Sequence, residues 1–233
     1  MASARTLYQL QQKDMEREAK HERVTDIDAA LEDDAAVDAA RAAYQGRHEE
    51  TALLLHQQRE REHEVDALRA KLKQVEEKLY GGKVKSPREL EDLQAEAKLL
   101  HAQARREEDV VLDIMQEVER ALSDAEALQK DLARIEAERR QERQELEAER
   151  RQLLADIERL RQEREDLAGT LGPEVNRLYD SLRASKGGQA VARVEQGMCQ
   201  GCRIHLPLSE LQRVRAGQEL VRCGSCGRVL YLP

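Results

Sequence analysis

Apolar residues recur every three or four positions on both sides of a short break at residues 81–87, which is rich in glycine, lysine and proline. This spacing puts the apolar side chains on one narrow seam of a helix, as at the a and d positions of a coiled coil. The seam positions are Val65, Leu68, Leu72, Val75 and Leu79 before the break, and Leu90, Leu93, Ala97, Leu100 and Ala104 after it. The pattern predicts two long helices, each with a seam that suits one partner helix.

The two seams also match each other residue by residue. In an antiparallel hairpin the numbers of facing residues add to a nearly constant total, and this holds both close to the break and far from it. Examples are Leu79 with Leu90, Leu72 with Ala97, Val24 with Leu146 and Leu10 with Leu160. Because a connection this short makes consecutive helices antiparallel neighbours, the sequence predicts a mainly α fold with a long antiparallel coiled-coil hairpin.

The break itself contains residues that end one helix and start the next. Gly81 is expected to take the left-handed conformation that follows many helices. Ser86, Pro87 and Glu89 suit the N-cap, N1 and N3 positions of the second helix. One helix therefore stops and another begins within a few residues.

We assign residues 1–185 to the hairpin, with its turn at 81–87 and a kinked short helix at 174–184, and residues 186–233 to a small terminal domain. A polar window at residues 136–145 interrupts the second seam. We interpret this window as a solvated, loosely paired stretch of helix. A segment that binds a partner or flexes is the alternative.

Composition supports elongated helices over a compact core. The 233 residues include neither Phe nor Trp, and 37% of them are charged, whereas a compact core of this size normally uses large aromatic side chains. No stretch has the roughly 18 apolar residues of a membrane span, and the first residues lack the apolar region of a signal peptide. We therefore expect a cytoplasmic protein that does not contact membranes.

All four cysteines lie in two C-x-x-C pairs of the terminal domain: Cys199, Cys202, Cys223 and Cys226. Two such pairs at this separation strongly indicate tetrahedral zinc, because the two-residue gap lets both thiolates of a tight turn face one ion. Four thiolates fill the coordination sphere, so we expect one structural Zn²⁺ and no enzymatic activity. Redox chemistry is the alternative, but it is typical of a βαβ context that the sequence lacks.

The rest of the terminal domain suits a β zinc ribbon. Gly201, Gly224 and Gly227 would permit the unusual backbone angles of tight turns, and His205 is expected on a strand surface because the four cysteines suffice as ligands. The β-prone runs are residues 190–195, 203–206, 219–222 and 228–232. We expect the ribbon and the arms to form separate cores, so that loss of a cysteine would unfold the ribbon alone.

The turn and the cysteine pairs together resemble a known family. The stretch Leu79–Gln94, followed by the two C-x-x-C pairs, is similar to the bacterial C4-type zinc ribbon domain family. The resemblance covers nearly the whole chain. It implies a zinc-binding adaptor with the four cysteines as ligands, and it implies links of some members to flagellar or secretion systems and to nucleic-acid binding.

Two functions remain open. An adaptor would bind a protein partner, and its candidate contacts are the basic residues of the turn, Lys83, Lys85 and Arg88, although these could also be simple solvated charges. Nucleic-acid binding is the alternative, because residues 186–233 carry a net charge of +4 in a chain of net charge −8. Its candidate contacts are Arg213, Arg215, Arg222 and Arg228. Tyr231 is the only aromatic residue there and the arms are acidic, so we favour the adaptor and leave a homodimer open.

Overall fold

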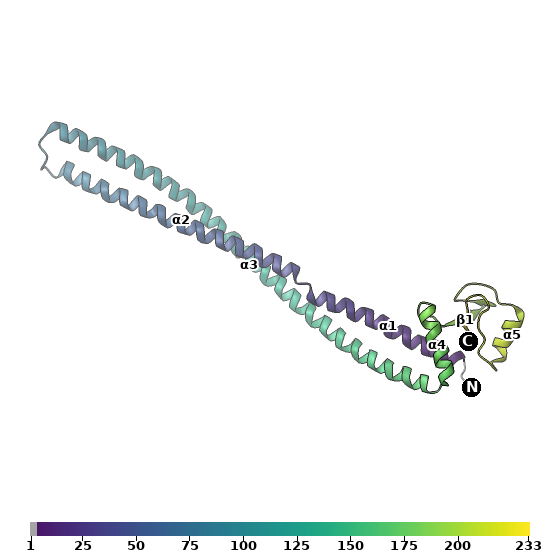
Figure 1. Cartoon of the computed structure of the whole chain (residues 1–233). Coiled ribbons are helices and arrows are strands. Elements are labelled where there is room, and N and C mark those ends of the chain that lie inside the picture. Colours follow the sequence, from purple (N-terminus) through teal and green to yellow (C-terminus); the bar gives the residue numbers. More distant parts are fainter. Residues whose placement is uncertain (1–3) are drawn as a thin grey trace. The chain divides into compact units, whose positions relative to one another are not determined.

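The computed structural model describes residues 4–233, which form a helical hairpin followed by a small ribbon (Figure 1). The helices are α1 (Ala4–Glu32), α2 (Ala35–Tyr80), α3 (Pro87–Gly169), α4 (Pro173–Ser185) and α5 (Leu208–Ala216), and the strands are β1 (Val191–Glu195), β2 (Met198–Cys199) and β3 (Val229–Tyr231). Helices α1 and α2 make the first arm and α3 makes the second. The predicted fold class is confirmed.

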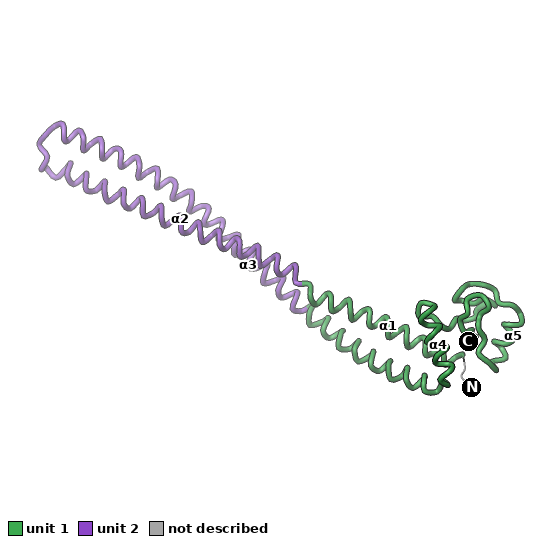
Figure 2. The backbone as a smooth tube through the Cα atoms, viewed as in Figure 1, with its two compact units in different colours: residues 1–33, 142–233 green, residues 34–141 purple. Residues whose placement is uncertain are grey.

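The chain divides into two compact units (Figure 2). Unit 1 contains residues 1–33 and 142–233, and unit 2 contains residues 34–141. Helix α1 belongs to unit 1 and α2 belongs to unit 2, while α3 contributes to both units. Each unit therefore holds part of both arms. The ribbon therefore belongs to the same compact unit as the neighbouring ends of the arms. The sequence predicted a boundary between hairpin and ribbon after residue 185. The two compact units divide the chain at other positions, so this boundary stays a prediction.

The seam of unit 2 is formed by the predicted positions. Leu72 and Val75 of α2 pack with Ala97 of α3 in one apolar cluster, and Leu93 and Leu100 lie against it. These residues come from both sides of the turn, and they include the pair Leu72 and Ala97 that the matching of the two seams predicted. The coiled coil is therefore intramolecular in this structure.

The turn differs from the prediction at one glycine. The N–H of Gly81 donates to the carbonyl of Glu77 at 3.0 Å, and Gly81 has a φ of −73°, so it does not take the left-handed conformation. Gly82 does, with a φ of 69°. The helical hydrogen bonding continues to Gly81, where a Cβ would lie 2.5 Å from the Glu77 carbonyl oxygen. The second helix begins at Pro87, as predicted.

The first arm is not continuous, which the seam pattern did not predict. Helix α1 ends at Glu32 and α2 begins at Ala35. In unit 1, Arg143 Nη2 donates to the carbonyl of Leu31 at 3.0 Å, and so satisfies one of the last carbonyls of α1. In unit 2, Arg139 Nε lies 2.9 Å from the carboxylate of Asp34, the residue that precedes α2.

These contacts correct the interpretation of the polar window at 136–145. Its seam residue Arg139 has a side chain only 13% exposed, and Arg41 of α2 lies 2.9 Å from Glu136 at the start of the window. The window is paired, although by charges and not by apolar side chains. Arginines occupy the seam here because the interrupted first arm offers carbonyl and carboxylate groups that an apolar residue could not satisfy.

The ribbon shares an apolar core with the base of the hairpin, which we define as the start of α1, the end of α3, and α4. Leu7 and Leu10 of α1 are fully buried in one cluster with Val191 of β1 and Val229 of β3. The remaining buried members of this cluster are Leu171, Tyr179, Leu182 and Ala190. The ribbon also has an apolar cluster of its own, which includes Val194, Val221 and Leu230, but because it shares the first cluster with the hairpin, the prediction that ribbon and arms form separate cores is wrong.

Polar contacts hold the same junction in register. Gln11 of α1 is 5% exposed, and its side chain donates to the carbonyl of Val191 at 3.0 Å and accepts from the N–H of Val191 at 2.6 Å. This amide side chain therefore binds β1 as a neighbouring strand would. Tyr8 stacks on Tyr231 with ring centroids 4.9 Å apart.

The sheet of the ribbon has the order β2-β1-β3. Strand β1 pairs with β2 antiparallel and with β3 parallel. Of the four β-prone runs, 203–206 and 219–222 form only isolated bridges, at His205 and Arg222. Helix α5 was not predicted, because its nine residues are too few to give a clear apolar periodicity.

A buried carboxylate lies in the base of the hairpin. Asp14 has no exposed surface and accepts a hydrogen bond of 2.8 Å from the Tyr179 hydroxyl. The guanidinium groups of Arg17, Arg164 and Arg183 approach its oxygens to 3.6, 3.4 and 3.4 Å. Burial, followed by the hydrogen bond to Asp14, raises the pKa of Tyr179 well above its usual value. Asp14 and Arg17 lie in α1, Arg164 lies in α3, and Tyr179 and Arg183 lie in α4. The cluster therefore joins these three helices around the carboxylate of Asp14.

We expect labels at Leu68 and Leu100 to lie roughly 10 Å apart or less, the spacing of packed helices, within one chain. Nitroxides carried on non-natural amino acids leave the four cysteines untouched and would broaden each other's electron-spin resonance spectra. Mixing singly labelled chains is the control. Broadening that arises only after mixing would mean that the coil forms between chains.

We expect Asp14→Asn to lower the free energy of unfolding by about 3 kcal/mol, because it leaves three arginines around a buried site without their charge partner. Tyr179→Phe should cost less, about 1–2 kcal/mol, since it removes one hydrogen bond to a charged group. Denaturant unfolding measures both. Glu16→Gln, on an exposed carboxylate of the same helix, is the matched control, and an equal loss there would contradict the special role of Asp14.

A candidate metal centre

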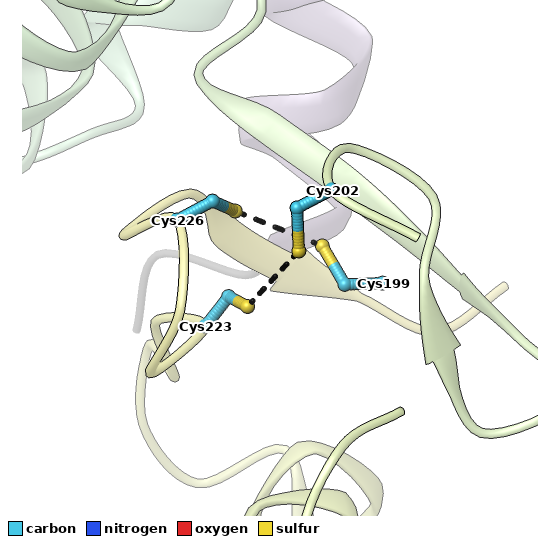
Figure 3. A group of neighbouring side chains, drawn as sticks. All are labelled: Cys199, Cys202, Cys223 and Cys226. Atoms are coloured by element: carbon cyan, nitrogen blue, oxygen red, sulfur yellow. Dashed lines mark hydrogen bonds between the residues drawn. The ribbon is translucent and has the colours of Figure 1, made fainter. Parts of the chain in front are cut away.

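Four thiols converge between the two C-x-x-C turns of the ribbon, and Figure 3 shows their side chains pointing toward one another. All four sulfur atoms lie within 4.8 Å of one another. The Sγ atoms of Cys199 and Cys226 are 3.9 Å apart, and those of Cys202 and Cys223 are 3.8 Å apart. Zinc–thiolate bonds of about 2.3 Å place tetrahedral sulfur ligands about 3.8 Å apart. The geometry therefore fits one Zn²⁺ at the centre of the four thiols.

The backbone of the first turn, Cys199–Cys202, folds back on the first cysteine. The N–H of Arg203 donates to the carbonyl of Cys199 at 2.7 Å, and the N–H of Cys199 donates to the carbonyl of Ile204 at 3.0 Å. Arg203 reaches this position with a φ of 58°, which is uncommon for a residue with a side chain. The residue after the second cysteine therefore closes the turn.

The second turn, Cys223–Cys226, repeats this arrangement. The N–H of Gly227 donates to the carbonyl of Cys223 at 2.8 Å, and the N–H of Cys223 donates to the carbonyl of Arg228 at 2.8 Å. Gly227 has a φ of 75°, equivalent to that of Arg203 in the first turn. Two similar turns thus present one pair of thiols each.

Of the three glycines predicted to permit unusual angles, only Gly227 has a positive φ. Gly201 is needed for close packing instead, because a Cβ there would lie 2.7 Å from Arg228 Cδ and 3.1 Å from Ala192 Cβ. At Gly224 a Cβ would meet the end of the Glu210 side chain at 2.8 Å, which a flexible carboxylate can relieve.

Arg228 supports the metal centre. Its guanidinium donates to three carbonyls, those of Gln189 at 2.8 Å, Gly201 at 3.2 Å and Lys186 at 3.2 Å. It therefore ties the first cysteine turn to the segment that leads out of α4. The side chain of Arg228, which its charge predicted as a nucleic-acid contact, is thus engaged within the protein, and nothing in the local sequence indicates that it turns inward.

The four free thiols differ in acidity. Burial raises the pKa of Cys199 to about 12. Burial also acts to raise the pKa of Cys226, but hydrogen bonds from the backbone and side chain of Arg228, with those from Cys202 and Cys223, lower it to about 7. A divalent cation favours the thiolate form of every ligand. The site therefore supplies one acidic thiol together with a buried thiol that needs the metal to ionise.

The remaining arginines proposed for nucleic acid are only partly available. Arg213 Nε lies 2.8 Å from a carboxylate oxygen of Glu219, and Arg222 Nε donates to the carbonyl of Gly227 at 2.9 Å. Arg215 is exposed and has no polar partner among residues 4–233. His205 is exposed, its backbone forms an isolated β-bridge with Met198, and it is not among the side chains that converge with the four thiols.

The basic residues of the turn lie on the surface. Lys83, Lys85 and Arg88 are all exposed, and within the described part of the chain none of them pairs with a carboxylate. These three residues were predicted from the sequence, whereas Gln11, which fixes β1 from 180 positions away, was not. Such a contact has no local sequence signal, because it depends on how the ends of the chain meet.

These features define a zinc-binding coiled-coil hairpin protein with a C4-type ribbon. The chain belongs to the CT398-like coiled-coil hairpin family, whose domain matches residues 5–187, and residues 198–230 match the C4-type zinc ribbon domain. The family suspected from the turn and the cysteines is confirmed. No curated protein matches the chain significantly.

Solved structures share the fold. CT398 from Chlamydia trachomatis is 22% identical, with a TM-score of 0.71 over 99% of this chain and 97% of that one. A protein of Mycobacterium smegmatis is 19% identical, with a TM-score of 0.65 over 97% and 96% of the two chains. The HP0958 protein of Helicobacter pylori is 22% identical, with a TM-score of 0.50 over 100% and 99%.

The hydropathy of the helices gives one further finding. Among residues 4–233, no helix combines the length and the apolar character that a membrane crossing requires.

We expect one zinc ion per chain by elemental analysis, and we expect Cys226→Ser to lose it. Because the ribbon shares a core with the base of the hairpin, this variant should also lower the melting temperature of the helical circular dichroism signal, by at least about 5 °C. Ser225→Ala, an exposed neighbour in the same turn, is the control. Unchanged helix melting after metal loss would contradict the shared core.

Proposed function

We propose that this protein is a cytoplasmic adaptor without enzymatic activity, which binds a protein partner through the tip of its hairpin. We define the tip as residues 78–88. The observation that carries the proposal is a group of exposed cations, Lys83, Lys85 and Arg88, that pair with no carboxylate of residues 4–233. The family resemblance extends the proposal to a setting in secretion or flagellar systems.

The metal centre supports a role without catalysis. A catalytic zinc keeps one coordination position open for water or substrate, whereas four cysteines converge here. The zinc would stabilise a ribbon too small to fold by burial alone. The ribbon in turn packs on α1, so the metal serves the fold of the base.

Nucleic-acid binding through the ribbon remains the alternative, and the net charge of +4 on residues 186–233 favours it. Against it, Arg213, Arg222 and Arg228 are engaged in contacts within the ribbon. Arg215 is left as the exposed candidate without such a contact. We therefore prefer the protein partner.

Capture of partners from the native cytosol by the full-length protein tests the proposal. The variant K83E/K85E/R88E should lose the partner, while K73E/R105E/R106E should keep it. The control reverses three exposed cations of unit 2 outside the tip, so both variants have the same net charge. Equal capture by wild type and the tip variant would contradict the proposal.

RNA and DNA binding by the full-length protein tests the alternative, nucleic-acid binding through the ribbon. We expect negligible RNA or DNA binding at about 0.15 M salt, where exposed charges are screened beyond about 8 Å. Binding that weakens with salt, with a log–log slope of about −0.7 to −0.9 per phosphate contact, and that is lost in R213E/R215E, would favour the nucleic-acid function instead.

A further inference from the structure

We propose that the tip recognises an acidic segment of a protein partner that also carries an apolar side chain. The acidic residues would lie against Lys83, Lys85 and Arg88, and the apolar side chain would enter the groove beside Tyr80. This inference rests on the proposed function and adds the chemical class of the partner.

The charge of the tip is the first observation. Residues 78–88 hold four basic side chains, Lys78, Lys83, Lys85 and Arg88, and no carboxylate. The whole chain has a net charge of −8 and residues 186–233 have a net charge of +4, which leaves −12 for residues 1–185. The hairpin around the tip is therefore acidic. The tip is therefore a positive patch on a negative arm, and charge complementarity selects a negative partner.

The second observation concerns the carboxylate partners of these cations. Elsewhere in unit 2 the arginines commonly pair with carboxylates, as Arg47 does with Glu50 and Arg61 with Glu64. Lys83, Lys85 and Arg88 have no such partner among residues 4–233. The start of α3 adds the partial positive charge of a helix N-terminus at the same place. Carboxylates from another chain would meet donors that no intramolecular acid already occupies.

A groove next to the tip is the third observation. It has a volume of about 580 Å³ and runs between the end of α2 and the start of α3. Its apolar lining comes from Leu79, Tyr80, Ala95 and Ala97, and its polar lining from Glu76, Glu91, Gln94, Lys98 and His101. The two carboxylates favour an apolar side chain in the groove itself and place the acidic residues of the partner against the tip cations. Tyr80 is 81% exposed, which leaves its ring available to cover an incoming side chain.

These observations favour a protein segment over other anionic partners. The tip has the four cations that the smallest polybasic membrane sites gather, but a bilayer surface cannot fill the groove between the two helices beside them. A nucleic acid has a negative charge at every phosphate. Its phosphates beyond the tip would therefore lie near Glu89, Glu91 and Asp92 at the start of α3, which would repel them. A peptide can confine its carboxylates to one end and present an apolar side chain at the other.

Fluorescence anisotropy with the full-length protein tests the inference. The probe is a short fluorescein-labelled peptide with a run of Asp and Glu followed by Leu and Phe. We expect binding that weakens with salt, that weakens about tenfold in K83E/K85E/R88E, and that weakens several-fold in Tyr80→Ala. The variant K73E/R105E/R106E should bind as wild type does. Circular dichroism of each variant checks that the hairpin is folded.

Two control peptides separate the parts of the inference. Replacing Leu and Phe by Gly should weaken binding several-fold, because it removes the side chain that enters the groove. Replacing Asp and Glu by Lys should abolish binding. Equal binding of all three peptides would overturn the inference.

The outcomes distinguish this inference from the proposed function. If the tip variant loses the cytosolic partner but wild type does not bind the acidic peptide, the inference is overturned and the adaptor function stands. If neither partner capture nor peptide binding depends on the tip, both are overturned. Phosphatidylserine vesicles or single-stranded RNA that bind the tip in place of the peptide would overturn the inference. So would a dimer, seen by light scattering, that K83E/K85E/R88E dissociates.

Discussion

Leu7 and Leu10 of α1 are fully buried against Val191 and Val229 of the ribbon, and the arrangement of unit 1 depends on this contact. A ribbon of this size buries too little surface to fold by itself. It has a small apolar cluster of its own around the buried cysteines, and it gains further burial from α1. The apolar start of α1 is covered in return, and the paired hydrogen bonds of Gln11 to Val191 fix the register between them.

Ion pairs between the two arms add to the narrow apolar seam that holds the hairpin together. With no Phe or Trp in the chain, the seam buries small and branched side chains, and ion pairs between the arms flank it, such as Arg23 with Glu149 at 2.8 Å. Each exposed pair contributes little. Buried or half-buried groups such as Asp14 and Arg139 contribute specificity, because an arrangement that left them unpaired would be costly.

The sequence was sufficient to predict the hairpin, its turn and the four converging thiols, because heptad spacing and paired C-x-x-C turns are local patterns. It did not predict the break before α2, where Arg139 and Arg143 replace an apolar seam. The shared core and the inward turn of Arg228 were missed for a different reason. Both depend on contacts between segments far apart in the chain, and Asp14 and Gln11 look like ordinary surface residues of a helix until their partners are known.

The parallel pairing of β1 with β3 and their packing on α1 have a consequence for biosynthesis. A ribosome releases α1 long before β3, because the hairpin lies between them in the chain, so the apolar face of Leu7 and Leu10 stays uncovered until the ribbon has been made. Exposed apolar surface on a nascent chain invites wrong associations. A metal ion that orders the ribbon would then also complete the core that α1 began, although the cysteines and α1 lie far apart in the sequence.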